Sequence, residues 1–350
     1  MKKSYVSFIA YGTPYYKKVR WKIMTRALAM VSGGLDSILA AKLIKDQGID
    51  VIGICFKSHF FNEENAIKMV KQIDIPLKVV DFSPAHFEMV KNPKNGYGKN
   101  MNPCIDCHAM MMRYCGQLLE ELDADFIITG EVLNQRPMSQ NRMALDKVKK
   151  ESGIQAKILR PLCAKMLVPT EMEENGLVDR EKLMDIQGRS RKVQMELAEQ
   201  WGIKEYPSPA GGCKLTEPNY SVRLKELLAF NKHPEERELG LLRIGRHFRV
   251  TPNAKVISTR TQDEVALLKK CLGKDDTILL VKDFNGSMVV IIGEATQEVL
   301  RFAAKVAIRY SKGKDEPKVT VKYAKFGEQV HSEFDEACAT DLELDAHIIQ

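Results

Sequence analysis

The hexapeptide Ser-Gly-Gly-Leu-Asp-Ser at positions 32–37 constrains the fold of this 350-residue chain more than any other feature. It directly follows the short apolar run 27–31, and a stretch with apolar residues at helical spacing follows it. The adjacent Gly33 and Gly34 let the backbone turn tightly and aim its N–H groups at an anion, while the next helix adds the positive end of its dipole. A strand, such a loop and a helix in this order predict a phosphate-binding site.

The side chains of the hexapeptide fit the same role. The hydroxyl groups of Ser32 and Ser37 can donate hydrogen bonds to phosphate oxygens. Asp36 cannot bind phosphate directly, because like charges repel, so we expect it to hold the Mg²⁺ that neutralises a polyphosphate. The competing interpretation is a helix cap, since Gly-Gly turns before a capping Asp or Ser are common. The hexapeptide lacks the Gly-Lys-Ser/Thr ending of a Walker loop, which disfavours transfer of a γ-phosphate.

Strand-like and helix-like segments alternate through the first part of the chain. The expected strands are 27–31, 51–56, 77–81 and 125–129, and the expected helices include 63–73 and 105–122. Repeated strand–helix units predict an α/β fold, a doubly wound parallel sheet with helices on both faces. In such a sheet a ligand lies beyond the carboxyl ends of the strands. We therefore expect the hexapeptide to converge there with Thr129, Gly130 and Glu131, which would shape the nucleotide pocket or merely end a strand.

The sequence changes character after about residue 235. Runs 278–281 and 288–292 are strand-like and surround a charged helix near 262–271, which predicts a smaller C-terminal α+β domain. The expected division is an N-terminal extension 1–23, a nucleotide-binding domain 24–230, a small domain 235–330 and an acidic tail 331–350.

The N-terminal extension is not expected to take part in catalysis. Its apolar run spans only Val6 to Ala10, shorter than the core of a secretory signal, so we expect Met24 to be the true start. No apolar run approaches the roughly 20 residues that cross a bilayer. These observations predict a cytoplasmic protein without a membrane partner.

Three of the eight cysteines are candidate ligands of a metal ion or cluster. Cys104 and Cys107 form a Cys-x-x-Cys pair where a loop enters a helix, so both thiolates can face one point. Cys213 follows two glycines, which permit a close backbone approach. Three soft ligands fit a [4Fe–4S] cluster with one open iron, or structural zinc, for which His108 is poorly placed as the fourth ligand. A redox disulfide between Cys104 and Cys107 would leave Cys213 unexplained. The remaining cysteines are expected to be ordinary buried or surface residues: Cys55, Cys115, Cys163, Cys271 and Cys338.

The C-terminal domain carries the signal for a polyanionic partner. The formal charge of +7 favours such a partner only mildly. Stretch 242–249, however, alternates apolar and basic residues at strand spacing, which places cationic groups on one face. The candidate RNA-binding residues are Arg243, Arg246, His247 and Arg249, and the segment 301–325 is also basic. Such faces suit a phosphate backbone and an exposed base, although a charged domain can also be merely soluble.

Several motifs resemble known families. The hexapeptide resembles the signature of the PP-loop ATP pyrophosphatases, which cleave ATP between the α and β phosphates and adenylate a substrate. Stretch 107–140 is similar to the matching part of bacterial tRNA 4-thiouridine synthetases. The likeness lies in Thr129-Gly130-Glu131, Gln135, Ser139, Gln140 and Arg160-Pro161-Leu162. The chain shows neither the N-terminal RNA-binding module nor the C-terminal rhodanese domain of many such synthetases. Stretch 243–250 resembles the RNA-binding domain of NFACT-family proteins, which implies tRNA or rRNA contact.

The resemblance implies an adenine nucleotide alpha hydrolase-like fold, ATP as cofactor, and Cys104, Cys107 and Cys213 as a cluster site or persulfide relay. The implied activity is ATP-dependent tRNA sulfur transfer, with Asp36, Cys107 and Cys213 as catalytic residues. Adenylation turns a uridine carbonyl oxygen into a leaving group, which a sulfide or persulfide then displaces. The expected partners are tRNA and a sulfur donor, either a cysteine desulfurase or sulfide.

We expect 4-thiouridine as the product, with 2-thiouridine as the alternative. Two other functions compete with sulfur transfer. A PP-loop enzyme that amidates or adenylates a small molecule is disfavoured by the cysteines and the basic domain. An RNA-binding protein with a relic nucleotide fold is disfavoured by the intact hexapeptide.

Overall fold

The computed structural model describes residues 24–208 and 212–350, which divide into two compact units between Thr216 and Glu217. The expected extension 1–23 lies outside the described residues. Within the described chain, no helix has the length and apolar character needed to span a membrane.

The first unit is built on a five-stranded parallel sheet in the order β3-β2-β1-β4-β5. Its strands are β1 Arg26–Met30, β2 Asp50–Lys57, β3 Leu77–Asp81, β4 Phe126–Thr129 and β5 Ile158–Leu159. Its helices are α1 Leu35–Lys45, α2 Glu64–Gln72, α3 Ser83–Lys91, α4 Cys104–Glu121, α5 Arg142–Ser152, α6 Glu171–Glu174 and α7 Lys192–Gln200. Short 3₁₀ turns span Gln155–Lys157, Pro161–Met166, Arg180–Lys182 and Lys214–Thr216.

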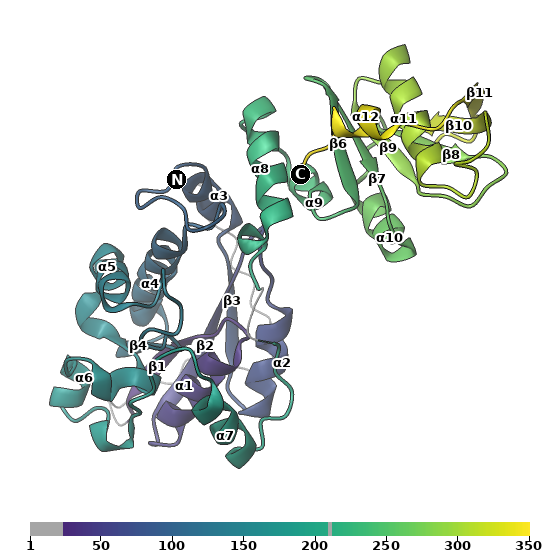
Figure 1. Ribbon diagram of the computed structural model, residues 1–350. Helices are drawn as coiled ribbons and strands as arrows, with labels where there is room; N and C mark the ends of the chain where they lie inside the picture. The colour runs from purple at the N-terminus through teal and green to yellow at the C-terminus, as the bar shows by residue number, and fades with distance from the viewer. Residues whose placement is uncertain (1–23, 209–211) are drawn as a thin grey trace. The chain divides into compact units, whose positions relative to one another are not determined.

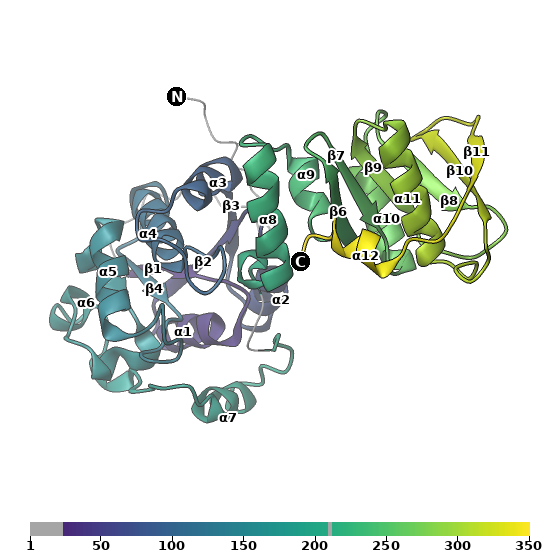
Figure 2. The same ribbon diagram turned by 45° about the horizontal axis from the view of Figure 1, so that its top comes forward.

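Helices cover both faces of this sheet, as Figures 1 and 2 show. Successive residues of a strand point to opposite faces. Ala27 and Ala29 of β1 accordingly pack into the core beneath α1, α2 and α7, while Leu28 packs with Leu118 and Leu119 of α4 on the other face. The prediction of a doubly wound parallel sheet is confirmed.

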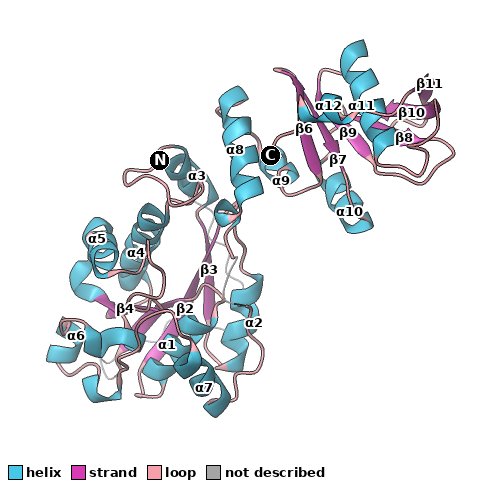
Figure 3. Cartoon of the chain, in the orientation of Figure 1, coloured by secondary structure: helices cyan, strands magenta, loops and turns pink. Residues whose placement is uncertain are grey.

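The second unit is a six-stranded antiparallel sheet in the order β11-β10-β8-β9-β7-β6 with helices on it (Figure 3). Its strands are β6 Arg246–Thr251, β7 Ala254–Ser258, β8 Thr277–Val281, β9 Val289–Gly293, β10 Val319–Lys325 and β11 Ser332–Glu336. Its helices are α8 Pro218–Phe230, α9 Glu236–Leu241, α10 Gln262–Cys271, α11 Gln297–Arg309 and α12 Asp341–Asp345. The α+β character expected for this part is confirmed.

The boundary between the units differs from the expected one near residue 230. Helix α8 belongs to the second unit, since its Arg223 guanidinium donates hydrogen bonds to the carbonyl oxygens of Leu242 and Gly245 at 2.9 and 2.8 Å. The buried side chains of Tyr220 and Leu224 lie on the same helix.

The acidic segment 331–350 is an integral part of the second unit. It supplies the edge strand β11 and the helix α12, and its final residues pair with β6 through Arg249 N–H to the His347 carbonyl and Ile349 N–H to the His247 carbonyl, both at 2.8 Å. Its carboxylates neutralise basic residues of α11: Lys305 contacts Glu343 at 2.6 Å and Arg309 contacts Asp341 at 2.5 Å. These pairings are why the segment folds onto the domain.

Candidate functional site

The hexapeptide forms the turn between β1 and α1, and its first glycine cannot be replaced without strain. Gly33 has φ +80°, and a Cβ there would lie 2.6 Å from the Asn65 Cβ and 2.7 Å from the Ala66 nitrogen of α2. Gly34 is the N-cap of α1, and none of the described side chains caps this helix. The N–H groups at its start are therefore available to an anion, which favours the phosphate loop over the helix-cap interpretation.

The two serines of the hexapeptide bond within the turn. Ser37 Oγ donates to the Gly34 carbonyl oxygen at 2.8 Å, and the Gly34 N–H lies 3.4 Å from Ser32 Oγ. Ser32 is exposed, whereas Ser37 is buried at the start of α1. Ser32 is thus the more accessible of the two hydroxyl donors.

The Asp36 carboxylate has one oxygen engaged and one oxygen unpaired. Its Oδ2 accepts a hydrogen bond from Gln135 Nε2 at 2.9 Å, and Gln135 Oε1 lies 3.3 Å from Nε2 of the buried Gln194. Its Oδ1 is buried and has no hydrogen-bond partner among the described residues. A buried carboxylate oxygen without a partner requires an explanation, and a bound cation supplies one. The residues present therefore fit Mg²⁺ beside a polyphosphate.

The end of β4 packs directly against the start of α1. A Cβ on Gly130 would lie 2.5 Å from both the nitrogen and the Cα of Ser37. Thr129 is paired with Met30 at the ends of β4 and β1, next to the hexapeptide. The structure thus brings together the two loops that were expected to converge at the carboxyl ends of the strands.

Glu131 is the centre of a buried ionic cluster. Its Oε2 accepts from Arg160 Nε at 2.9 Å and from Thr129 Oγ1 at 3.2 Å, and its Oε1 accepts from His108 Nδ1 at 3.0 Å. Burial alone would raise the pKa of this carboxyl, but Arg160 and His108 outweigh it and lower the pKa to about 2. Both oxygens of Glu131 are occupied, so this residue braces the site, and the expected nucleotide contact falls to its neighbours Thr129 and Gly130.

The two cysteines of the Cys-x-x-Cys pair are held differently at the N-terminus of α4. Cys104 is half-buried, and its Sγ lies 3.2 Å from the amide Nδ2 of Asn102. Cys107 is buried, and its Sγ lies 3.2 Å from Nε2 of His86 on α3. Burial raises the pKa of the Cys107 thiol well above its ordinary value, and the nearby Cys213 and Cys104 raise it further. Cys213 and Cys104 thus act on the ionisation of the Cys107 thiol.

The segment that carries Cys213 is tied to this region by two hydrogen bonds. The Lys214 N–H donates to the Phe60 carbonyl oxygen at 3.0 Å, and Asn100 Nδ2 donates to the Thr216 carbonyl oxygen at 2.7 Å. All eight cysteines are free thiols. Across residues 24–208 and 212–350, no group of three His, Cys, Asp or Glu side chains is arranged to hold a metal ion. The thiols thus do not form a ready-made metal cage, and the [4Fe–4S] cluster stays a prediction.

His86 is a site residue that the sequence does not reveal. It stacks on Phe82 with ring centroids 4.7 Å apart, and the rings of Phe60 and Phe61 lie 5.6 and 5.4 Å away. Burial, and then the nearby His59, lower the pKa of His86 to about 4, so its ring is neutral at neutral pH. A lone histidine on an amphipathic helix carries no spacing signal, which is why only the fold connects it with Cys107.

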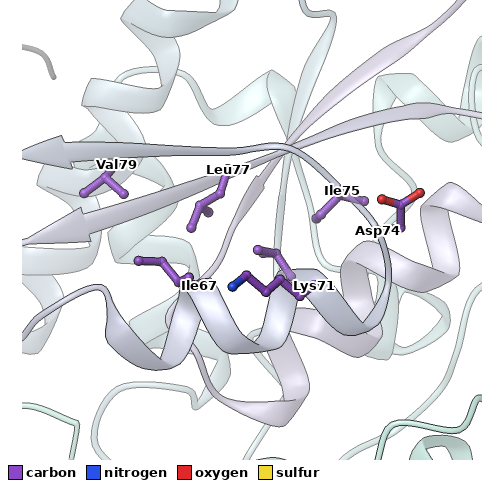
Figure 4. A pocket seen from close by; sticks show the side chains of 7 residues that line it. Ile67, Lys71, Asp74, Ile75, Leu77 and Val79 are labelled. Atoms are coloured by element: carbon purple, nitrogen blue, oxygen red, sulfur yellow. The ribbon is translucent and has the colours of Figure 1, made fainter. Parts of the chain in front are cut away.

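One pocket lined mainly by apolar residues does not belong to this site. It has a volume of about 150 Å³ and lies between α2 and β3 (Figure 4). Its lining is mainly apolar and comprises Ile67, Val70, Lys71, Asp74, Ile75, Leu77 and Val79. Asp74, Ile75 and Leu77 stand at the amino end of β3, whereas the hexapeptide stands at the carboxyl end of β1. The pocket is therefore separate from the phosphate loop.

The four basic residues predicted to contact RNA differ in accessibility. Arg243 is exposed, and the half-buried Arg246 lies over the Tyr310 ring at 4.1 Å. Arg249 is held by Glu226 at 2.5 Å. His247 is fully buried, with Nε2 2.8 Å from the Ile244 carbonyl oxygen, so the expectation that it contacts RNA is corrected. His247 lies on the face of β6 opposite the buried Phe248 and shares that face with Arg249, which contacts Glu226 of α8, so both faces of the strand are covered.

Part of the basic segment 301–325 is neutralised within the second unit. Lys322 contacts Glu333 at 3.7 Å, Lys325 contacts Asp275 at 3.9 Å, and α12 holds two basic residues of α11. Lys312, Lys314 and Lys318 are exposed between α11 and β10. These lysines and Arg243 are exposed, and their contact with RNA stays a prediction.

Comparison with known proteins assigns a family to each unit. Residues 23–166 match the family model described as thiamine biosynthesis protein (ThiI), and residues 245–348 match that of the NFACT protein RNA binding domain. The chain therefore combines a ThiI-family PP-loop domain with an NFACT-type RNA-binding domain.

Curated relatives include tRNA-specific 2-thiouridylases. The Syntrophus aciditrophicus protein is 26% identical over 241 residues, which is 63% of this chain and 61% of that protein. The Clostridium acetobutylicum protein is 36% identical over 120 residues, 29% of this chain and 34% of that protein. The chain thus spans between about one third and three fifths of the length of these relatives.

Two solved structures show weaker likenesses. One is a 4-thiouridine synthetase–RNA complex with bound ATP, 16% identical, covering 51% of this chain and 52% of that chain with a TM-score of 0.34. The other is the C-terminal part of the fibronectin/fibrinogen-binding protein from Streptococcus suis, 12% identical, covering 82% of this chain and 98% of that chain with a TM-score of 0.28.

Proposed function

We propose that this chain is an ATP-dependent tRNA sulfurtransferase that adenylates a uridine carbonyl and replaces its oxygen with sulfur. One observation carries the proposal: a continuous line of contacts joins the phosphate loop to the thiols. Ser37 abuts Gly130, the next residue Glu131 bonds to His108, and His108 follows Cys107 on α4. Activation acts on the oxygen and sulfur delivery on the carbon of one carbonyl group, so contacts between the two groups of residues support a site that does both.

Different residues of the first unit would bind the phosphates, the Mg²⁺ ion and the rest of the nucleotide. The N–H groups and hydroxyls of residues 32–37 would hold the phosphates, and the unpaired Asp36 Oδ1 would hold Mg²⁺. Bound ATP supplies the adenylyl group that makes the carbonyl oxygen a leaving group. Thr129 and Gly130 would line the nucleotide pocket beside the start of α1. Glu131, held by Arg160, fixes the His108 ring next to the thiols.

Cys107 and Cys213 would deliver the sulfur. Their proximity supports a relay in which the outer sulfur of a persulfide on one cysteine attacks the activated carbon and AMP leaves. The second thiolate then attacks the sulfur–sulfur bond, which leaves sulfur on the uridine and a Cys107–Cys213 disulfide. A [4Fe–4S] cluster on Cys104, Cys107 and Cys213 is the alternative sulfur carrier. Iron analysis of anaerobically purified protein decides between them, and Cys213→Ser should remove any cluster.

Likeness within 107–140 to 4-thiouridine synthetases favours carbon 4, and the ThiI family match supports it. The alternative product is 2-thiouridine, for which the curated relatives are named. The NFACT-type domain would bind the tRNA. In the persulfide relay the donor would be the persulfide of a cysteine desulfurase, which passes on sulfane sulfur without a further oxidant, whereas sulfide would serve only the cluster alternative. With tRNA as substrate, the reaction would take place in the cytoplasm.

The test is mass spectrometry of tRNA nucleosides from a strain that lacks the gene, complemented with wild type, Cys213→Ser or Cys338→Ser. Cys338 is half-buried in the second unit, whereas Cys104, Cys107 and Cys213 belong to the first, and it serves as the matched control. We expect one thiouridine to disappear, to return with wild type and Cys338→Ser, and to stay absent with Cys213→Ser. An unchanged thionucleoside profile would contradict tRNA thiolation and favour adenylation of a small molecule.

A further inference from the structure

The His86 ring is packed in a cage of aromatic rings and makes one hydrogen-bond contact with the described residues. Its Nε2 lies 3.2 Å from the Cys107 sulfur, while its Nδ1 is buried and has no hydrogen-bond partner among the described residues. The ring is fully buried and stacks on Phe82. Because buried polar groups are normally hydrogen-bonded, the contact with the Cys107 sulfur is the one that accounts for this buried ring.

The unpaired Nδ1 indicates which ring nitrogen carries the proton. If Nδ1 carried it, an N–H donor would be buried without an acceptor, and such orphaned donors are rarer in proteins than orphaned acceptors. If Nε2 carries it, the N–H points at the Cys107 sulfur and only a lone pair stays unpaired. The geometry thus favours His86 as the donor and the sulfur as the acceptor.

The same cage reaches the segment of Cys213. The Phe60 ring contacts the His86 ring at a centroid distance of 5.6 Å, and the Phe60 carbonyl oxygen accepts the Lys214 N–H at 3.0 Å. His86 therefore touches Cys107 directly and is one residue removed from the backbone that carries Cys213.

The two thiols of the Cys-x-x-Cys pair have different hydrogen-bond donors. Residues three apart on a helix lie on the same face, so Cys104 and Cys107 could compete for one partner. Asn102 contacts the Cys104 sulfur, and His86 contacts the Cys107 sulfur, each at 3.2 Å. Two separate donors can hold the two sulfurs in different directions.

We propose that His86 is a positioning residue for sulfur transfer: its Nε2–H donates a hydrogen bond to the Cys107 sulfur and keeps that sulfur directed at Cys213 rather than at Cys104. The role in catalysis rests on the proposed sulfurtransferase function, whereas the positioning itself does not. His86 makes no contact with substrate in this account, since it acts through Cys107.

Two substitutions separate the hydrogen bond from packing. His86→Gln keeps an N–H donor the same number of bonds from the backbone, whereas His86→Phe keeps an aromatic ring in the cage and removes the donor. The full-length wild type and both variants are oxidised with diamide, and the disulfides among Cys104, Cys107 and Cys213 are quantified by peptide mass spectrometry. Thermal unfolding of each variant is measured in parallel.

We expect Cys107–Cys213 to be the main disulfide in wild type and in His86→Gln. In His86→Phe the ratio of Cys107–Cys213 to disulfides of Cys104 should fall about tenfold, the ratio that one hydrogen bond of ordinary strength supports. The rate of tRNA thiolation at saturating substrate should fall by a similar factor, with the KM for ATP unchanged.

Three outcomes would overturn the proposal. They are a wild-type chain that forms no Cys107–Cys213 disulfide, a His86→Phe chain with the wild-type disulfide ratio, and a His86→Gln chain shifted as far as His86→Phe. Failure of the sulfurtransferase function would be recognised separately, because a wild type inactive on tRNA would still give the disulfide ratios.

Discussion

The two units each bury a carboxylate between two nitrogen-bearing side chains, but the surroundings of the two carboxylates differ. In the first unit Glu131 lies between Arg160 and His108, at the carboxyl end of β4 beside the phosphate loop. His108 is half-exposed, and the structure gives its Nε2 no partner among the described residues. The Glu131 cluster thus holds His108 through Nδ1 and leaves its Nε2 available.

In the second unit Glu226 of α8 lies between Arg249 of β6 and Lys255 of β7, at 2.5 and 2.8 Å. Arg249 also stacks over the Phe230 ring at 4.4 Å. The cationic groups here are used to attach α8 to the sheet. The comparison teaches that basic residues at regular spacing need not form a binding face, because a buried carboxylate can engage them inside the fold.

The largest effect is expected from removing the cation ligand of the first unit. Asp36→Asn should lower ATP-dependent AMP formation about a hundredfold or more, since positioning a metal ion contributes several kcal/mol to catalysis. RNA binding measured by filter retention should not change. Asp46→Asn, which removes an exposed partner of Lys42 at the other end of α1, is the matched control and should keep full activity. An active Asp36→Asn chain would end the adenylation proposal.

The next largest effect concerns the buried carboxylate of the first unit. Glu131→Gln leaves the Arg160 charge buried without its counter-ion and should cost about 3–5 kcal/mol of unfolding free energy. Trp201 packs against the core of the first unit, so tryptophan fluorescence during urea unfolding, in chains that all carry Trp21→Phe, reports on that unit. Glu196→Gln, at an exposed pair with Lys192, should cost roughly 0–1 kcal/mol. Equal costs for the two substitutions would contradict the assignment of Glu131 as a brace.

The same carboxylate predicts a pH dependence. Because the folded state lowers the pKa of Glu131 from 4.5 to about 2, its stabilising contribution is present above pH 4.5 and is lost as the pH falls toward 2. The difference in stability between wild type and Glu131→Gln should therefore shrink across that range. Tryptophan-detected unfolding at a series of pH values measures it, and a difference independent of pH would count against the ionised pair.

A smaller effect is expected from the corresponding carboxylate of the second unit. Glu226→Gln should cost about 1–3 kcal/mol, less than Glu131→Gln. Arg249 also packs on Phe230, and the buried Lys255, whose pKa burial lowers, can lose its proton, which an arginine such as Arg160 cannot do. Hydrogen exchange of residues 246–258 should accelerate while the tryptophan transition of the first unit stays in place. A shift of the tryptophan transition would show that the two units do not unfold independently.

The smallest effect is expected at the exposed cation of the basic stretch. Arg243→Ala should weaken RNA binding only several-fold and reduce the slope of log affinity against log salt by about 0.7–0.9, the value for one phosphate contact. Its melting temperature should match that of wild type. The contrasting Arg249→Ala should lower the melting temperature, because it removes the partner of Glu226. Unchanged salt dependence in Arg243→Ala would show that Arg243 makes no phosphate contact and would favour Lys312, Lys314 and Lys318 as the RNA-binding residues.

The sequence by itself determined the architecture of the first unit and the position of its phosphate loop. Both depend on local patterns: apolar runs alternate with helical spacing, and Gly33 must adopt a left-handed φ against α2. The proximity of the three cysteines was also predictable, through the resemblance of their spacing to a known family.

Only the tertiary structure decided which polar groups are used inside the fold. His86 and Cys107 are 21 residues apart, Glu131 and Arg160 are 29 apart, and Arg249 and His347 are 98 apart. Alternation of apolar and basic residues placed His247 among the RNA contacts, yet β6 is covered on both faces. The sequence predicted an acidic tail at the end of the chain. In the structure this segment forms β11 and α12, whose carboxylates pair with basic residues of α11. Burial and pairing are properties of the assembled fold, because the partner of a charged residue is chosen by packing across the chain and not by its neighbours in sequence.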